Sequence, residues 1–368
     1  MGDVCGHQDV VTIDRLVSHV STVPVAAGQK LSLFVREKVS SGLLEAADGT
    51  DFAGKVVLFV HGGYCPSTLA FDVPYRDYSW MAFLARAGYD VFAMDMTGYG
   101  RSSRPQMDNP RNLAPAFQPR VIPSVLQEPC APDYPYVLVN SDSETDDINC
   151  VVDYVCALRN VTQIALIGWS GGGIRTGTFA SRYPGKVDRL ILHASSNYDR
   201  DNTDHPPADL PQPGAPMTIQ MRDVGIDQRW LGTCTDMSSI EPGMPDHIWM
   251  LNAEHDRLGA GWGSGGLRAP TRTYWGWNAR SASAITAPTL MMTGEQDHLL
   301  PSNLQLMEDL GASRKAFVTM EIATHFAVWE RQRHVLHKAS LQWLNSTALE
   351  AGDGSYFRAS PDGKIRPV

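Results

Sequence analysis

Hydrophobic residues in this chain gather in short runs, and most runs are followed by apolar positions at helical spacing. The runs are rich in Val, Ile and Leu and end in turn residues, a pattern typical of a mostly parallel sheet covered by helices. The predicted central strands are 55–62, 89–96, 164–170, 190–194, 289–294 and 316–322. The predicted helices are 80–87, 146–159, 172–182 and 332–344. An edge strand over 31–39, paired antiparallel with 12–20, completes this α/β pattern.

Two long segments interrupt the alternation. The first, 103–139, has prolines at 105, 110, 119, 123, 128, 132 and 135, which exclude a regular helix or a central strand. We expect a long ordered insertion or a lid there. The second, 200–283, opens with a Pro-rich stretch and then carries Trp230, Trp249, Trp262, Trp275 and Trp277. This change of composition predicts a cap inserted between two strands.

These interruptions define the predicted domain organisation. The core comprises 1–199 and 284–345, the cap 200–283, and a separate tail 346–368. Residues 355–368 of the tail are expected to form a hairpin. Its turn would be Pro361-Asp362-Gly363, because a glycine accepts the positive φ that such a turn needs.

Composition and charge narrow the classes of function. With 368 residues, of which 43% are apolar and 19% charged, the chain can bury a sizeable core. Its formal charge is −9, and Lys and Arg are scattered rather than clustered. Because a polyanion would require a basic patch, nucleic-acid binding is not expected. The composition neither requires nor excludes a homo-oligomer.

The compartment is predicted from the ends of the chain and from its cysteines. No apolar run approaches the roughly 20 residues of a membrane helix, and the amino terminus lacks the pattern of a secretory signal. We therefore expect a soluble cytoplasmic protein that does not bind membranes. The 6 cysteines are dispersed and are interpreted as reduced thiols. A Cys130–Cys150 pair stays an alternative if the protein is exported.

The clearest chemical signal is Gly168-Trp169-Ser170-Gly171-Gly172, which lies directly between a predicted strand and a predicted helix. A serine on such a sharp turn has a strained backbone, so small residues are needed two positions before and after it. Gly168 and Gly172 meet that need. The helix that follows directs its positive end and the Gly171 N–H toward a developing oxyanion. Ser170 is therefore the predicted nucleophile.

In this strand-turn-helix frame the sequence resembles the α/β-hydrolase family, over residues from about 30 to 345. The segment His61-Gly62-Gly63-Tyr64 follows a strand where the family keeps its oxyanion loop. The resemblance implies that the N–H of Gly63, with Tyr64 as a further candidate, is the second oxyanion donor beside Gly171. It also implies a scaffold role for Asp95 and Arg101, in a segment similar to the family's D-x-x-G-x-G-x-S turn. The implied fold is an α/β-hydrolase core with an inserted cap.

The same resemblance locates the other two members of a catalytic triad, an acid followed by a histidine. Asp297 lies in the loop after strand 289–294, and His325 follows the last predicted central strand. Glu295 and Asp199 are rival acids, the latter because some family members draw the acid from an earlier loop. His298, beside Asp297, is expected to be a loop residue or part of the pocket wall.

The predicted substrate pocket rests on aromatic residues, namely Trp169, Trp262, Trp275 and Trp277. Aromatic walls favour an apolar or aromatic substrate, although packing of the cap onto the core explains tryptophans equally well. The segment 261–266 matches G-x-G-x-x-G, but no strand precedes it, so a dinucleotide site is not expected. His334 and His337 lack the carboxylates or cysteines of a metal site, and we expect a solvated helix face. No metal or other cofactor is predicted.

The predicted function is hydrolysis of a small-molecule carboxylic ester or lactone through an acyl-enzyme on Ser170. An acyltransferase or a C–C bond hydrolase using the same triad stays an alternative. Dehalogenase or epoxide hydrolase chemistry is disfavoured, because it requires Asp at position 170. A receptor or scaffold without turnover is also disfavoured, because the triad looks complete.

Overall fold

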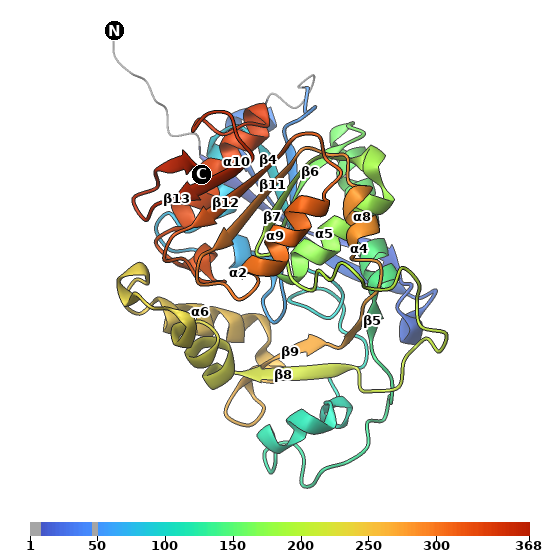
Figure 1. Ribbon diagram of the computed structural model, residues 1–368. Coiled ribbons are helices and arrows are strands. Elements are labelled where there is room, and N and C mark those ends of the chain that lie inside the picture. Colours follow the sequence, from blue (N-terminus) through green and yellow to red (C-terminus); the bar gives the residue numbers. More distant parts are fainter. Residues whose placement is uncertain (1–8, 46–50) are drawn as a thin grey trace.

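The computed structural model describes residues 9–45 and 51–368, and a central sheet forms its core (Figure 1). In spatial order its strands are β1 (Val10–Val20), β2 (Lys30–Ser40), β4 (Asp90–Met94), β3 (Val56–Val60), β6 (Ile164–Trp169), β7 (Val187–His193), β11 (Thr289–Gly294), β12 (Lys315–Met320), β13 (Tyr356–Ala359) and β14 (Ile365–Pro367). Neighbours from β4 to β13 run parallel, whereas β1, β2 and β14 pair antiparallel. The predicted α/β-hydrolase architecture therefore forms, including the edge hairpin of β1 and β2.

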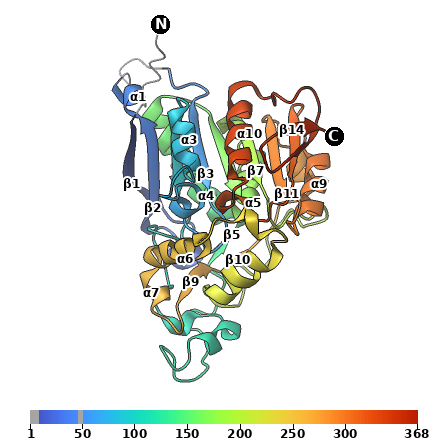
Figure 2. The same cartoon turned by 90° about the vertical axis from the view of Figure 1, so that its left-hand side faces the viewer.

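Helices cover both faces of this sheet because its strands are apolar on both sides (Figure 2). On β3, Val57 and Phe59 face the layer that contains α3 and α10, while Leu58 and Val60 face the layer of α4 and α5. The core helices are α1 (Ser41–Glu45), α2 (Ser67–Phe71), α3 (Trp80–Arg86), α4 (Ser141–Arg159), α5 (Gly171–Arg182), α8 (Ala279–Ser283), α9 (Leu300–Asp309) and α10 (Arg333–Ser346).

The start of α4 shows how local sequence sets an element boundary. The helix begins five residues earlier than its apolar spacing predicts, because Asn140 caps it. The Asn140 side chain accepts hydrogen bonds from Asp142 N at 3.0 Å and Ser143 N at 2.9 Å. The Ser143 hydroxyl in turn accepts one from Asn140 N at 3.0 Å. This polar first turn lacks the apolar residues from which the helix was predicted.

The tail forms the predicted hairpin, with φ of 86° at Gly363, but it does not lie apart from the core. Strand β13 adds to the sheet beside β12 in parallel register, from Phe317 opposite Tyr356 to Met320 opposite Ala359. Phe357 is buried within the core. The tail is thus part of the core, because an alternating apolar strand gains burial at a free sheet edge.

The Pro-rich insertion and the cap form one layer beyond the carboxyl ends of the parallel strands (Figure 1). Its regular elements are β5 (Val139–Asn140), β8 (Met217–Met221), β9 (Gly266–Pro270), β10 (Arg272–Thr273), α6 (Met244–His255) and α7 (Arg257–Ala260). Leu113 and Leu138 of the insertion pack in one cluster with Ile219 and Trp262 of the cap. Helix α8, inside the predicted cap boundary, belongs instead to the core, because Ala282 packs in the sheet layer of α5.

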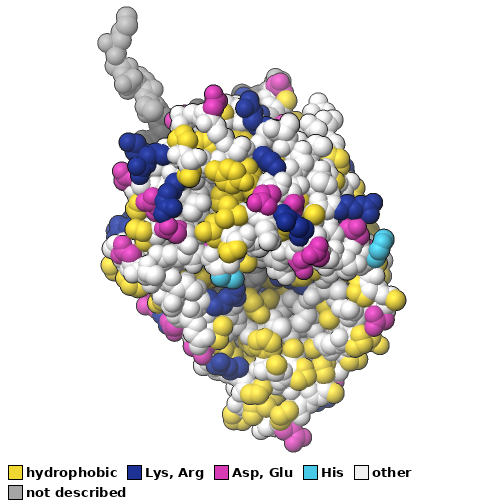
Figure 3. All heavy atoms as spheres, viewed as in Figure 1, with side chains coloured by type: hydrophobic (Ala, Val, Ile, Leu, Met, Phe, Trp, Pro, Cys, Tyr) yellow, Lys and Arg dark blue, Asp and Glu magenta, His cyan; other side chains and the backbone are white. Residues whose placement is uncertain are grey.

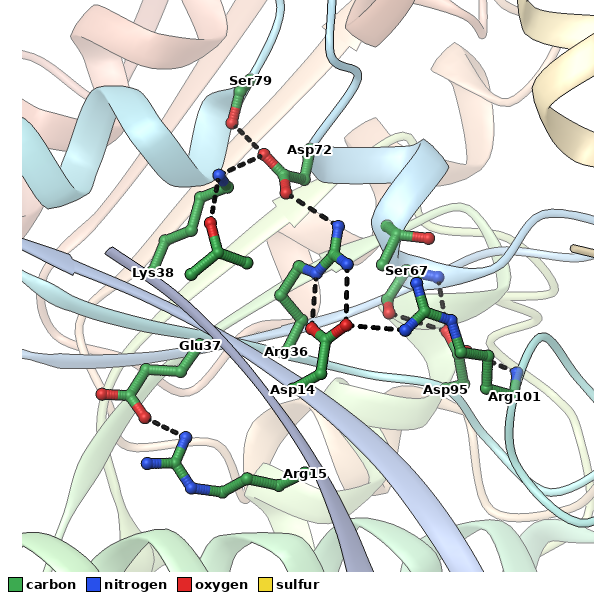
Figure 4. A network of polar contacts seen from close by, with 12 residues as sticks. Asp14, Arg15, Arg36, Glu37, Lys38, Ser67, Asp72, Ser79, Asp95 and Arg101 are labelled. Atoms are coloured by element: carbon green, nitrogen blue, oxygen red, sulfur yellow. Dashed lines mark hydrogen bonds and ion pairs between the residues drawn. The ribbon is translucent and has the colours of Figure 1, made fainter. Parts of the chain in front are cut away.

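A polar network, drawn in Figure 4, supports the loop that follows β4. Asp95 accepts hydrogen bonds from the backbone N–H of Ser67 at 2.8 Å and of Arg101 at 3.0 Å. A Cβ on Gly100 would stand 2.0 Å from a carboxylate oxygen of Asp95, so only glycine fits this turn, where φ is 49°. The Arg101 side chain reaches Asp14 on the edge strand. These contacts support a scaffold role for Asp95 and Arg101.

Two further observations concern the cysteines and the length of the helices. Cys130 and Cys150 are both free thiols, so the structure does not pair them. Within 9–45 and 51–368, no helix combines the length and the apolar character needed to cross a membrane.

Candidate active site

Ser170 lies on the sharp turn between β6 and α5, with φ of 55° and ψ of −118°. A non-glycine residue at positive φ is strained and persists only where its surroundings enforce it. Here the close packing of the turn does so. A Cβ on Gly172 would stand 1.9 Å from the Val60 carbonyl oxygen, and one on Gly168 2.5 Å from the Gly172 carbonyl oxygen. Gly172 is therefore required for the turn to approach β3, and Gly168 for the first turn of α5 to pack against the end of β6.

The predicted acid and base meet at the carboxyl ends of β11 and β12. His325 Nδ1 lies 2.9 Å from Asp297 Oδ2, and the Asp297 side chain is fully buried. Asp297 Oδ1 also accepts the Leu299 N–H at 2.9 Å. Burial alone would raise the pKa of Asp297, but the His325 ring and these hydrogen bonds outweigh it and lower that pKa. Asp297 is thus ionised at neutral pH and orients the imidazole.

The structure does not bring the rival acids to His325. Glu295 points to the surface, where it pairs with Arg358. Asp199 is exposed, and its carboxylate accepts the Asp201 N–H at 3.1 Å. His298 approaches Asp297 at 3.4 Å, but its side chain is 68% exposed, as expected of a residue at a cavity mouth.

The two predicted oxyanion donors lie beside the nucleophile. A Cβ on Gly62 would stand 2.9 Å from Ser170 Cβ, so the Gly62–Gly63 backbone passes directly over Ser170. The Cβ position of Gly171 is 3.6 Å from Gly63 N, and Gly171 begins helix α5. The helix dipole therefore adds to two neighbouring backbone N–H groups. Tyr64 extends from this loop to the cap, where its hydroxyl lies 2.7 Å from Thr218 Oγ1.

His61 holds the oxyanion loop from behind. Its Nε2 accepts the Met96 N–H at 3.1 Å, which leaves Nδ1 to donate to the Gly62 carbonyl at 2.7 Å. Burial, together with the nearby Arg175 guanidinium, lowers the pKa of His61 to about 3. His61 is therefore neutral and fixes the loop.

The loop that carries His325 is held by residues that sequence patterns did not reveal. Trp169 Nε1 donates to the His325 carbonyl at 3.0 Å. Glu330, which is fully buried, accepts the Thr324 N–H at 3.0 Å and Trp230 Nε1 at 3.0 Å. Burial raises the pKa of Glu330 above its usual range. No local motif marks Glu330, because its partners come from both the core and the cap.

Ser170 and His325 line one cavity of about 220 Å³, between the core and the cap. Figure 3 shows this face hollowed between the two parts, with basic and histidine side chains near the hollow. Its aromatic walls are Tyr64, Trp169, Trp249, Phe326 and Trp329. Its polar walls include Ser196, Asn197, Gln220, Arg229, Asn252, Arg272 and His298.

Three of the four predicted pocket tryptophans do not line this cavity. Trp262 packs in the cluster shared by cap and insertion, under Arg268. Trp275 is buried at the start of α4, where its backbone bonds the Ser141 hydroxyl at 3.0 Å. Trp277 packs on α5, where a Cβ on Gly177 would overlap its ring. These residues fill the packing role, and only Trp169 lies in the cavity wall as predicted.

The segment and histidines set aside from the sequence have structural places. Residues 261–266 form a cap turn that leads into β9. His337 does not lie on a solvated helix face as expected. It is buried with its ring 5.9 Å from that of Trp80, and burial lowers its pKa to about 3. His334 is partly exposed beside Arg331.

With this geometry established, comparison with known proteins identifies the family. The family model of the alpha/beta hydrolase fold matches residues 55–332, well over half of the chain. The chain belongs to this family. No curated protein matches its sequence.

Solved structures share the fold at low sequence identity. A thermophilic esterase from Thermogutta terrifontis is 17% identical with a TM-score of 0.52, over 91% of this chain and 100% of that one. The naproxen esterase of Bacillus subtilis is 12% identical with a TM-score of 0.53, over 91% of this chain and 92% of that one. The 2-hydroxy-6-oxo-6-phenylhexa-2,4-dienoate hydrolase of a Rhodococcus strain is 16% identical with a TM-score of 0.52, over 92% and 100% of the two chains. At these identities the likeness concerns the fold alone.

Proposed function

We propose that this α/β-hydrolase cleaves a carboxylic ester, with lactones in the same class, through an acyl-enzyme on Ser170. One observation carries the proposal. Ser170, on a strained turn, lines the same cavity as His325. The Nδ1 atom of His325 is hydrogen-bonded to the buried carboxylate of Asp297. This is the arrangement of a nucleophile, a general base and an orienting acid.

In the first half of the reaction, Ser170 Oγ forms a bond to the ester carbonyl carbon while His325 Nε2 takes the hydroxyl proton. The backbone N–H groups of Gly63 and Gly171 donate to the resulting oxyanion. Its collapse breaks the bond to the alkoxy oxygen, and His325 returns the proton to the departing alcohol. Asp297 keeps the imidazole in the tautomer that can accept the first proton.

In the second half, water attacks the acyl group on Ser170 and gives its proton to His325. The second tetrahedral intermediate then releases the acid and restores Ser170. Water can enter past the exposed side chains of Arg229 and His298 at the cavity mouth. An acyltransferase would replace this water with an alcohol or thiol. A C–C bond hydrolase would break a carbon–carbon bond in the first half, in place of the bond to the alkoxy oxygen.

The test compares the wild type with Ser170→Ala on a panel of p-nitrophenyl esters and lactones. We expect wild-type hydrolysis without a second substrate and a loss of several orders of magnitude in kcat for the variant. A fluorophosphonate should label the wild type at Ser170 and leave the variant unlabelled. Retained activity in Ser170→Ala would exclude the triad mechanism. Turnover that needs an added alcohol or thiol, and that yields a new ester or thioester in place of the free acid, would indicate an acyltransferase.

A further inference from the structure

Arg272 is a cationic residue of the cavity that the proposed ester chemistry does not use. Two-residue strand β10 pairs in parallel with β5, Arg272 opposite Val139, at the start of α4. This pairing holds the guanidinium beside the nucleophile turn. Its Nη1 and Nη2 lie 3.1 Å and 3.6 Å from the point where a Cβ on Gly171 would stand.

The charge of Arg272 is only partly compensated by the protein. The nearest carboxylate oxygen, Glu144 Oε1, is 3.8 Å from its Nη1. That same oxygen accepts a hydrogen bond from Arg175 Nε at 2.9 Å, so two arginines share one carboxylate. Arg272 also stacks over the Tyr274 ring, at 4.8 Å. Because this contact uses the face of the guanidinium, its in-plane N–H groups stay free to donate to another acceptor.

Arg272 is largely shielded from water, although one of its buried donors lacks a partner. Its side chain is 18% exposed, and its buried Nη1 makes no hydrogen bond within the part of the chain that the structure describes. An unpaired donor on a buried cation is costly, so native structures rarely keep one without a reason. A ligand that accepts hydrogen bonds would remove that cost.

The cavity as a whole favours an anion. The chain carries a formal charge of −9, yet the described cavity lining contains Arg229 and Arg272 and no Asp or Glu. Arg229 is exposed at the mouth, with a hydrogen bond of 3.4 Å to Gln220. Two cations without a carboxylate among them create a positive potential in a low-dielectric cavity.

We propose that the substrate bears a carboxylate, which Arg272 binds beside the oxyanion loop and which Arg229 attracts at the mouth. The inference rests on the proposed function, because it names the substrate class of the same site. The planar guanidinium fork fits a carboxylate through two parallel hydrogen bonds. A cavity of about 220 Å³ suits a compact anionic ester better than a large flat one.

The test uses pairs of p-nitrophenyl esters that differ only in charge. In the first pair the acyl chain ends in a carboxylate or in an isopropyl group of the same shape. In the second pair the carboxylate or a neutral isostere lies on the aryl alcohol. For the wild type we expect a higher kcat/KM for the charged member of one pair. In Arg272→Met that preference should fall about 10- to 100-fold, because charge-assisted hydrogen bonds are lost.

Two further variants serve as controls for the effect of Arg272→Met. Arg280→Met removes an arginine that is 81% exposed on the core helix α8, and it should leave the charge preference unchanged. Arg272→Lys keeps the charge but loses the fork, so its preference should fall between those of the wild type and Arg272→Met. Circular dichroism and the rate of fluorophosphonate labelling at Ser170 report whether each variant is folded and reactive.

The outcomes separate this inference from the proposed function. If the wild type neither hydrolyses any ester nor is labelled at Ser170, the proposed function fails. If it hydrolyses esters but favours the neutral member of both pairs, the carboxylate proposal is overturned without any variant. Equal losses on charged and neutral esters in a folded Arg272→Met would also overturn it, and would assign Arg272 to the oxyanion or to the scaffold.

Discussion

The carboxyl group of Asp297 shows at the residue scale how the site controls protonation. The group is buried, which opposes its ionisation, yet its pKa is lowered by His325 and the Leu299 N–H. Burial lowers the pKa of His193 to about 4 and, together with the Arg175 guanidinium, lowers that of His61 to about 3. The buried Asp297 carboxylate is hydrogen-bonded to the ring of His325 and orients it.

We predict that Asp297→Asn lowers kcat by about 10⁴-fold, because an amide stabilises the wrong imidazole tautomer and cannot balance the imidazolium charge. Asp199→Asn is the matched control, since Asp199 is exposed and, among the described residues, its carboxylate bonds only within its own loop. Burst kinetics on p-nitrophenyl esters would measure both variants. A larger loss in Asp199→Asn would transfer the acid role to the earlier loop.

At the scale of elements, the antiparallel neighbours β2 and β4 are joined by buried ions as well as by apolar contacts. Arg159 lies at the end of α4, and its Nη2 is 2.5 Å from Glu37 Oε1 on β2. Its Nε forms a second ion pair with the carboxylate of Asp90 on β4. Both carboxylates are fully buried. Burial and the neighbouring Glu37 raise the pKa of Asp90 to about 7 although Arg159 opposes the rise. The arginine therefore allows two carboxylates to face each other across the sheet.

We predict that Arg159→Met destabilises the fold by about 3–5 kcal/mol at pH 8, because it leaves the buried Asp90 carboxylate without its Arg159 partner and Glu37 with Arg15 alone. The pKa of Asp90 lies above its ordinary value of 3.8, so its contribution to stability is present below that value and is lost as pH rises through about 7. Removing Arg159 raises this pKa further, so the loss should be smaller at pH 5 than at pH 8.

Urea unfolding at both pH values measures this difference. Lys186→Met is the control, because Lys186 forms a more exposed ion pair with Asp153 of α4, the helix that also carries Arg159. Its effect should stay within about 1 kcal/mol. Equal losses for Arg159→Met at pH 5 and pH 8 would mean that lost packing, rather than charge, determines its effect.

At the scale of the whole molecule, the tryptophans of the cap either line the cavity or pack the cap against its neighbours. Trp249 on α6 lines the cavity, whereas Trp262 packs against the Pro-rich insertion. Trp230 does not line the cavity but packs against Trp329, which does, and it bonds Glu330. The cap thus closes the site from above and also fixes the histidine loop of the core from the side.

We predict that Trp249→Ala changes the ranking of esters by acyl size and raises the relative kcat/KM of bulky acyl chains, because it enlarges the cavity. Trp262→Ala should lower the free energy of unfolding by about 3–5 kcal/mol and keep the ranking, because it empties a packed cluster outside the cavity. A panel of esters of rising chain length, with urea unfolding of each variant, tests both. A changed ranking in a folded Trp262→Ala would return this residue to the substrate pocket.

The sequence by itself determined the alternating strands and helices, the turn at Ser170 and the order of Asp297 and His325. These features are local, since a buried strand, a glycine-flanked serine and a loop after a strand each leave a signature within about ten residues. Only the tertiary structure decided that Arg272 lies against Gly171, that β13 joins the sheet, and which tryptophans face the cavity. Such contacts join segments far apart in the chain through packing, and the local sequence shows which positions are apolar but not which distant residue packs against them.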